Sequence, residues 1–157
     1  MKKEITISYE ETNELYGAEK MLMEKAIKIS EKAYAPYSGF KVGAAVLSND
    51  GIFTGCNQEN MAFSPTICGE RVAMFSAACQ SDSPIKIVAI YCQSDKYDVT
   101  EASGPCGVCR QVMSEFEMRY GKKIRVVLKG GSSNYLIFDG VENLLPFSFD
   151  GLKNENL

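Results

Sequence analysis

Histidine is absent from this sequence of 157 residues. Without histidine the chain lacks the commonest metal ligand and the usual general base of enzymes. The absence excludes nucleophilic pairs of serine or cysteine with histidine, and it excludes zinc fingers that mix cysteine and histidine. Any proton transfer must therefore fall to carboxylates, and a zinc site must be built mainly from sulfur.

The sequence also lacks an apolar run long enough for a signal peptide or a membrane span, so we expect a cytoplasmic protein without membrane contact. The net charge is −3 and the pI is near 5.1. Lysine and arginine are scattered, and no basic stripe is present that would follow a phosphate backbone. These features favour a small-molecule substrate over a nucleic acid.

Internal repeats, low-complexity tracts and glycine- or serine-rich linkers are missing as well. A chain of this length, with 45% hydrophobic residues, is large enough to bury roughly 70% of its unfolded surface in one core. We therefore expect a single domain over residues 1–150. The last residues, 151–157, are expected to form a frayed tail.

Helical and strand patterns alternate along the chain. Asp50 and Gly51 separate two β-type runs and indicate a hairpin. Gly121 is expected to end a helix that opens at Gly104. The pattern predicts helices over about 14–34, 64–79, 104–120 and, briefly, 141–145, and strands over 40–47, 52–56, 85–92, 124–128 and 135–138. Five strands interleaved with helices predict a three-layer α/β/α sandwich around one mixed five-stranded sheet.

The most informative residues are three cysteines and one glutamate. Cys68 is followed two residues later by Glu70, and Cys106 is followed three residues later by Cys109. Residues three apart are neighbours on a helix, so Cys106 and Cys109 can bind one metal ion. Three thiolates leave one tetrahedral position of zinc free for water, which is the arrangement of a catalytic site.

Both cysteine segments are expected to begin helices, where the positive helix end lowers the pKa of a thiol. Arg71 and Arg110 lie beside the motifs and are candidates to offset the excess charge of three thiolates. Cys68 and Glu70 are about 200° apart around an ideal helix. They can converge only near its first turn, where Glu70 would meet a metal-bound water and exchange protons with it.

The remaining cysteines leave an alternative open. Cys56, Cys79 and Cys92 lie in apolar runs and are expected to be small core residues rather than disulfide partners. Any one of them as a fourth ligand would instead close a structural zinc site. On that reading Glu70 is only a carboxylate favoured by the helix dipole.

Longer motifs around these residues resemble a known family. They are Ala35 to Leu47 (APYSGFKVGAAVL), Thr54 to Asn60 (TGCNQEN), Thr66 to Arg71 (TICGER) and Pro105 to Gln111 (PCGVCRQ). In this order they resemble the zinc-dependent cytidine deaminases in their small, homotetrameric, three-cysteine form. The resemblance spans nearly the whole chain.

This resemblance implies an activity and a cofactor. One Zn²⁺ per subunit would be held by Cys68, Cys106 and Cys109, and zinc-bound hydroxide would attack C4 of the cytosine ring. Glu70 would carry protons to N3 and then to the departing ammonia. The products of cytidine and 2′-deoxycytidine would be uridine and 2′-deoxyuridine, as in pyrimidine salvage.

The resemblance also implies how a nucleoside is held. Asn57 and Glu59 would bind the ribose hydroxyls, and Phe40 would line the pocket. The backbone N–H of Gly69 would reach the pyrimidine O2, and the carbonyl of Gly104 would receive the amino group of the substrate.

Residues from neighbouring subunits and around the ligands complete the implied site. Phe149 occupies the place of a C-terminal aromatic residue that completes another subunit's pocket, which implies a homotetramer. Gln111 follows Arg110 in the second motif and belongs with it around the ligands.

The sequence departs from the family pattern between the sugar segment and the first ligand. Residues 61–65 (MAFSP) differ, and Phe63 lacks the hydroxyl of the usual tyrosine, which commonly works across a subunit boundary. Gly69 stands where alanine is usual, which is expected to loosen the helix start.

Two alternatives to a cytidine deaminase remain at this point. One is a deaminase acting on a free base, an antibiotic nucleoside or a base in RNA, against which the ribose segment and the acidic charge argue. The other is a non-catalytic, zinc-stabilised interaction module.

Overall fold

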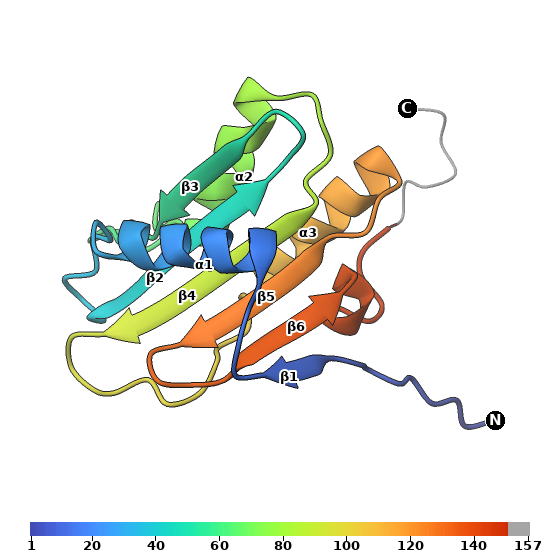
Figure 1. The fold of residues 1–157 in the computed structure, drawn as a ribbon, viewed down its shortest axis with the longest axis horizontal. Helices are drawn as coiled ribbons and strands as arrows, with labels where there is room; N and C mark the ends of the chain where they lie inside the picture. Colours follow the sequence, from blue (N-terminus) through green and yellow to red (C-terminus); the bar gives the residue numbers. More distant parts are fainter. Residues whose placement is uncertain (151–157) are drawn as a thin grey trace.

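A computed structural model describes residues 1–150, and the expected tail at 151–157 lies outside this range. Its centre is one six-stranded sheet with the order β1-β6-β5-β4-β2-β3 (Figure 1). The strands are β1 (Glu10–Thr12), β2 (Phe40–Leu47), β3 (Ile52–Cys56), β4 (Ile87–Ser94), β5 (Arg125–Gly130) and β6 (Tyr135–Asp139). The helices are α1 (Gly17–Ser30), α2 (Gly69–Gln80), α3 (Gly107–Tyr120) and the short 3₁₀ helix η1 (Val141–Asn143).

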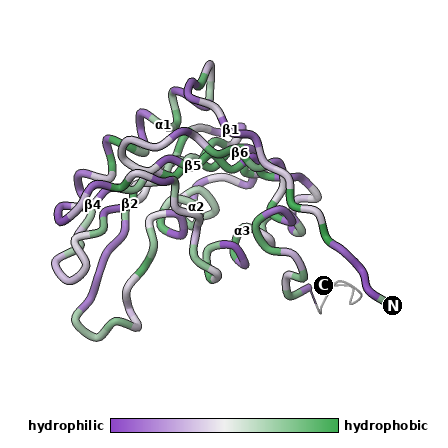
Figure 2. Tube along the Cα trace, turned by 90° about the horizontal axis from the view of Figure 1, so that it is seen from below, coloured by the Kyte–Doolittle hydropathy of each residue, from purple (hydrophilic) through white to green (hydrophobic). Residues whose placement is uncertain are grey.

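Helices cover the sheet on both faces, so the predicted three-layer sandwich is confirmed. Figure 2 shows α1 on one side of the strands and α2 and α3 on the other. Along β4 the side chains alternate between the two layers: Val88 and Ile90 belong to the core with α2 and α3, and Ala89 and Tyr91 to the core with α1. The sheet is mixed, because β4 and β5 are parallel and its other neighbours are antiparallel.

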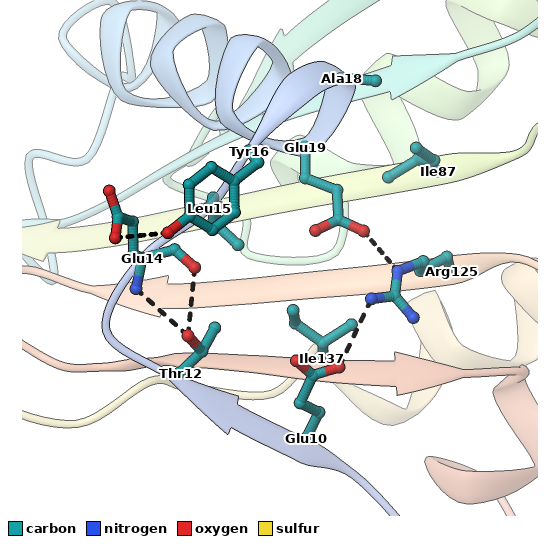
Figure 3. Close-up of a pocket in the computed structure, with 10 residues that line it drawn as sticks. All are labelled: Glu10, Thr12, Glu14, Leu15, Tyr16, Ala18, Glu19, Ile87, Arg125 and Ile137. Carbon is teal, nitrogen blue, oxygen red and sulfur yellow. Dashed lines mark hydrogen bonds and ion pairs between the residues drawn. The ribbon is translucent and has the colours of Figure 1, made fainter.

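The prediction of five strands was wrong by one strand. β1 is a short edge strand that pairs with β6 through residues 10–12. Its sequence, Glu-Glu-Thr, has no alternation of apolar and polar residues and therefore gave no strand signal. Tertiary contacts hold it instead: Arg125 of β5 pairs with Glu10 at 3.6 Å and also with Glu19 of α1 (Figure 3).

Both helices that carry the cysteines begin later than predicted. α2 begins at Gly69 rather than near residue 64, and α3 begins at Gly107 rather than at 104. In each case the preceding cysteine is the N-cap and has extended backbone, with φ, ψ of −75°, 149° at Cys68 and −63°, 163° at Cys106. α3 ends where predicted, before Gly121, which adopts φ 60°.

The topology places both helix starts at one edge of the sheet. β3 and β4 are each antiparallel to β2, which lies between them, so they run in the same direction. α2 follows β3 and α3 follows β4, so both helices begin near the same edge. Among residues 1–150, no helix has the length and apolar character needed to cross a membrane.

Candidate functional site

Three cysteine thiols meet where α2 and α3 begin. The Sγ atom of Cys106 lies 3.7 Å from that of Cys68 and 3.4 Å from that of Cys109. All three sulfurs lie within 4.8 Å of one another. Cys106 also caps α3, because its Sγ accepts a hydrogen bond from the backbone N–H of Cys109 at 3.5 Å. The cluster brings together the three residues that the motifs predicted.

The spacing of the sulfurs fits a tetrahedral zinc ion. With Zn–S bonds of about 2.3 Å, tetrahedral geometry puts two sulfurs about 3.8 Å apart. The observed separations are close to this value, and three thiols are ligands suited to zinc. Cys68, Cys106 and Cys109 would therefore hold the ion.

The other cysteines within residues 1–150 do not join this cluster. All six cysteines are free thiols in this structure. Cys56 and Cys92 are buried, but Cys56 receives a hydrogen bond from a glutamine and Cys92 faces a backbone carbonyl. Cys79 is exposed, so its prediction as a core residue was wrong. It lies near the end of α2, so no fourth cysteine joins the cluster of Cys68, Cys106 and Cys109.

Arg71 supplies positive charge to the thiols. Its Nη2 lies 3.9 Å from the Sγ of Cys68. A hydrogen bond from the Cys109 thiol, together with the hydrogen bond and charge of Arg71, lowers the pKa of Cys68 to about 5 against the opposing effect of burial. The same hydrogen bond, together with burial, raises the pKa of Cys109. Cys68 is therefore the first of these two thiols to ionise, and metal binding would deprotonate the other.

Glu70 is the buried carboxylate of the site. It is the second residue of α2, directly past the N-cap, and only 4% of its surface is exposed. Burial raises the pKa of Glu70 to about 7, and the neighbouring charge of Cys68 raises it as well. Its Oε2 has no hydrogen-bond partner anywhere in the described part of the chain. A buried polar atom without a partner is costly in a finished core, so this one indicates a ligand or water that is absent from the chain itself.

A cavity of about 290 Å³ opens beside Glu70 and the sulfurs. This size is near the lower end for small-molecule sites. Seven of the predicted site residues line it: Phe40, Asn57, Glu59, Cys68, Glu70, Gly104 and Cys106. A cavity with apolar walls and a few polar groups suits a small polar ring with a sugar.

Asn57 joins the cavity wall to the start of β2. Its Nδ2 donates to the carbonyl of Phe40 at 2.9 Å, and its Oδ1 accepts from the N–H of Val42 at 2.8 Å. The side chain thus acts as a strand partner for β2 and fixes the position of Phe40. An amide retains one further N–H and one further lone pair, which remain for a ligand.

Glu59 holds the turn before β2. Its Oε2 accepts from the backbone N–H groups of Tyr37 and Ser38 at 2.9 and 3.2 Å, and its Oε1 accepts from the Ser38 hydroxyl. The bond from Ser38 keeps the pKa of Glu59 below its ordinary value. Ser38 also lines the cavity and was missed as a site residue. Its place in the first family motif was the only signal in the sequence.

Gly69 packs tightly between two strands. A Cβ on Gly69 would lie 2.9 Å from the carbonyl oxygen of Val42 and 3.3 Å from the N of Asn57. The missing side chain lets α2 approach β2 and β3 closely. Gly69 is buried beside Cys68 and Glu70, and it does not itself line the cavity.

Two predicted aromatic residues lie away from this cavity. Phe63 and Phe149 are each 71% exposed, and neither lines the cavity of its own chain. Phe63 has φ 58°, a conformation that a side-chain-bearing residue rarely adopts, and its ring lies 5.9 Å from that of Tyr37. Both rings are thus available to a neighbouring molecule.

Arg110 and Gln111 bind backbone rather than sulfur. The guanidinium of Arg110 donates to the carbonyl oxygens of Pro105 and Leu144, and the amide of Gln111 binds the backbone of Phe149. The predicted charge offset at the thiols therefore falls to Arg71 alone of the two arginines. Arg110 and Gln111 fix the chain around the cysteines instead.

Comparisons with known proteins agree with this geometry. The family model for the zinc-binding region of cytidine and deoxycytidylate deaminases matches residues 17–123, which include the whole cluster and Glu70. A cytidine deaminase of Sporosarcina psychrophila is 46% identical over 99 residues, covering 62% of this chain and 68% of that protein. One from Mycoplasma genitalium is 32% identical over 121 residues, covering 77% and 87%. The crystal structure of cytidine deaminase from Burkholderia pseudomallei matches with a TM-score of 0.73 and 38% identity, over 85% of this chain and 100% of that one.

Proposed function

Since the chain belongs to the family of cytidine and deoxycytidylate deaminases with this zinc-binding region, we propose that it hydrolyses cytidine and 2′-deoxycytidine to uridine and 2′-deoxyuridine. The observation that carries the proposal is one cavity lined by Cys68, Cys106 and the buried Glu70, whose Oε2 has no hydrogen-bond partner among the described residues. The third thiol, Cys109, lies within 4.8 Å of the other two sulfurs. A structural zinc module has no use for such a cavity beside its ligands.

Each reacting group has a role in the proposed reaction. When bound, zinc supplies a Lewis acid that lowers the pKa of water toward ~7, so that water attacks C4 at neutral pH. Glu70 accepts a proton from that water and passes it to N3 of the ring. It then carries the second proton to the amino group, which leaves as ammonia when the C4–N bond breaks. Arg71 offsets the negative charge of the thiolates during these steps.

The cavity wall supports the proposed binding of the nucleoside. Asn57 and Glu59 bind the ribose with the hydrogen-bonding capacity that their backbone contacts leave free. Phe40 covers the ring from the start of β2. The N–H of Gly69 binds the pyrimidine O2, and the carbonyl of Gly104 accepts from the amino group of the substrate.

The exposed aromatic residues support a homotetramer with shared sites. Phe149 and Phe63 are outside their own cavity, and in the proposed assembly they complete the cavity of a neighbouring copy. Residues 1–150 act as one domain, because both core clusters flank a single sheet. Six free cysteines suit a reducing compartment, which supports a cytoplasmic location.

Replacement of Glu70 by glutamine tests the proposed chemistry. Zinc-loaded wild-type protein should convert cytidine, measured as loss of absorbance in the cytosine band. Glu70→Gln keeps the size of the side chain, so it should retain zinc and fold while turnover falls about 10²–10⁴-fold. Retained turnover in this variant would contradict the assignment of Glu70. No conversion by zinc-loaded wild type would contradict the proposed substrate.

A further inference from the structure

Gln111 makes an unusually complete contact with a residue 38 positions away. Its Nε2 donates to the backbone carbonyl of Phe149 at 3.0 Å, and its Oε1 accepts from the backbone N–H of the same residue at 3.2 Å. One side chain thereby satisfies both backbone groups of Phe149, as a neighbouring strand would. This fixes the peptide at Phe149 in both position and orientation.

Arg110 makes a second tie to the same C-terminal segment. Its Nε donates to the carbonyl of Pro105 at 2.6 Å, and its Nη1 donates to the carbonyl of Leu144 at 2.7 Å. The planar guanidinium is a rigid fork, so it joins the residue before Cys106 to the end of η1. Two consecutive side chains of α3 therefore hold the C-terminal segment at two points, residue 144 and residue 149.

The segment between these ties has no regular secondary structure, and its aromatic side chains point into solvent. Phe147 is 92% exposed with φ 57°, and Phe149 is 71% exposed. Exposed phenylalanine rings bury little apolar surface in their own chain, and a left-handed conformation at a residue with a side chain is strained. Such a segment is suited to contact another molecule. Its backbone is already held in one conformation, so binding would not have to offset the entropy cost of ordering it.

We propose that Gln111 is a positioning residue for deamination: it holds the backbone of Phe149, so that this ring is presented at a fixed place relative to the cysteines of α3. The inference rests on the proposed function, in which Phe149 of one copy completes the cavity of another. Gln111 lies two residues beyond Cys109 on the same helix. The first turn of α3 carries cysteines of its own copy's cavity, and through Gln111 it also holds the aromatic ring that completes the cavity of a neighbouring copy. One helix therefore positions parts of two sites.

Two replacements of Gln111 separate this role from simple folding. Gln111→Leu keeps much of the size and removes both hydrogen bonds. Gln111→Glu keeps the acceptor for the Phe149 N–H and places a carboxylate against its carbonyl oxygen. Glu115→Gln, an exposed change one turn further along α3, is the matched control. Zinc content, unfolding midpoint, hydrogen exchange of the Phe149 N–H, kcat and KM are measured for each zinc-loaded protein.

Loss of one hydrogen bond changes an equilibrium by about twofold to tenfold. Exchange at Phe149 should therefore accelerate by this factor in Gln111→Leu, and KM for cytidine should rise by a similar factor, while zinc content and kcat stay within about twofold. Gln111→Glu should also raise KM, and Glu115→Gln should change neither. If Gln111 acts through the ring, Gln111→Leu should raise KM no further in a protein that already carries Phe149→Ala.

Three results would overturn the inference: unchanged exchange in Gln111→Leu, faster exchange with unchanged KM, or additive effects of Gln111→Leu and Phe149→Ala. A wild-type protein that does not convert cytidine would instead overturn the proposed function. In that case the exchange measurement still decides whether Gln111 holds Phe149. The two failures are thus distinguishable.

Discussion

Gly69 and Gly107 occupy equivalent places, and replacement of each by alanine is expected to have opposite effects. Each is the first residue of a helix and follows a cysteine N-cap. By propensity, alanine is better than glycine in a helix by up to about 1 kcal/mol. A Cβ on Gly107 would meet nothing within 4 Å, so Gly107→Ala should stabilise the protein by about 0.4–1 kcal/mol.

At Gly69 the packing term opposes this gain. A Cβ there would lie 2.9 Å from the carbonyl oxygen of Val42 and 3.1 Å from the Cα of Cys56, and neither backbone atom can rotate away. Overpacking of this kind typically costs about 1–3 kcal/mol, and most of this range lies above the gain of up to about 1 kcal/mol from helix propensity. We expect a net loss of about 1–2 kcal/mol, or a fall in Tm of about 2–8 °C.

The measurement is urea and thermal unfolding of both zinc-loaded variants beside the wild type. The two changes are chemically identical and occupy the same helix position, so propensity cancels in the comparison. The expected loss therefore comes from the short distance between α2 and Val42 in this chain. A Gly69→Ala protein as stable as Gly107→Ala would refute the reasoning.

Glu59 has a pKa held below the ordinary 4.5, mainly by the hydrogen bond from Ser38. Its bonds to the turn therefore stabilise the folded state above about pH 4.5, and they are lost as the pH falls through the lower folded-state value. Ser38→Ala should return this pKa toward 4.5 in an NMR titration of the Glu59 carboxyl, and an unchanged pKa would contradict the assigned cause. Removal of zinc by a chelator should lower the Tm of the wild type and of Cys79→Ser equally, because Cys79 is exposed and outside the cluster. Cys106→Ser should melt at the same temperature with and without chelator; a shift like that of the wild type would argue against this cluster as the zinc site.

The sequence predicted the ends of those helices and strands that are set by neighbouring turn residues. The hairpin of β2 and β3 has the predicted bounds, because Asp50 and Gly51 form its turn. The end of α3 was predicted because Gly121 adopts a conformation suited to glycine. The starts of α2 and α3 were misplaced because the prediction placed them next to prolines, whereas each helix begins after a cysteine with extended backbone. β1 was missed because its pairing with β6 joins residues more than a hundred positions apart.

The same distinction applies to the site. Residues whose chemistry is carried by the side chain, such as the three cysteines and Glu70, were evident from their types and spacing. Ser38 was missed, and the contact between Gln111 and Phe149 was not foreseen, because both act through hydrogen bonds to distant parts of the chain. A serine or glutamine is common on any surface, and its partner is invisible in the sequence.

The sequence by itself predicted the candidate metal ligands and the candidate proton-transfer group. Without histidine, a metal site had to use thiolates and proton transfer had to use a carboxylate. Only the tertiary structure decided that the three thiols meet beside one cavity and that Glu70 is buried there with one oxygen, Oε2, left without a partner among the described residues. The physical reason is the strand order: β2 lies between β3 and β4 and antiparallel to both, so the helices that follow them begin at one edge. Cys68 and Cys106, 38 residues apart, meet there because the sheet sets the direction of each chain segment.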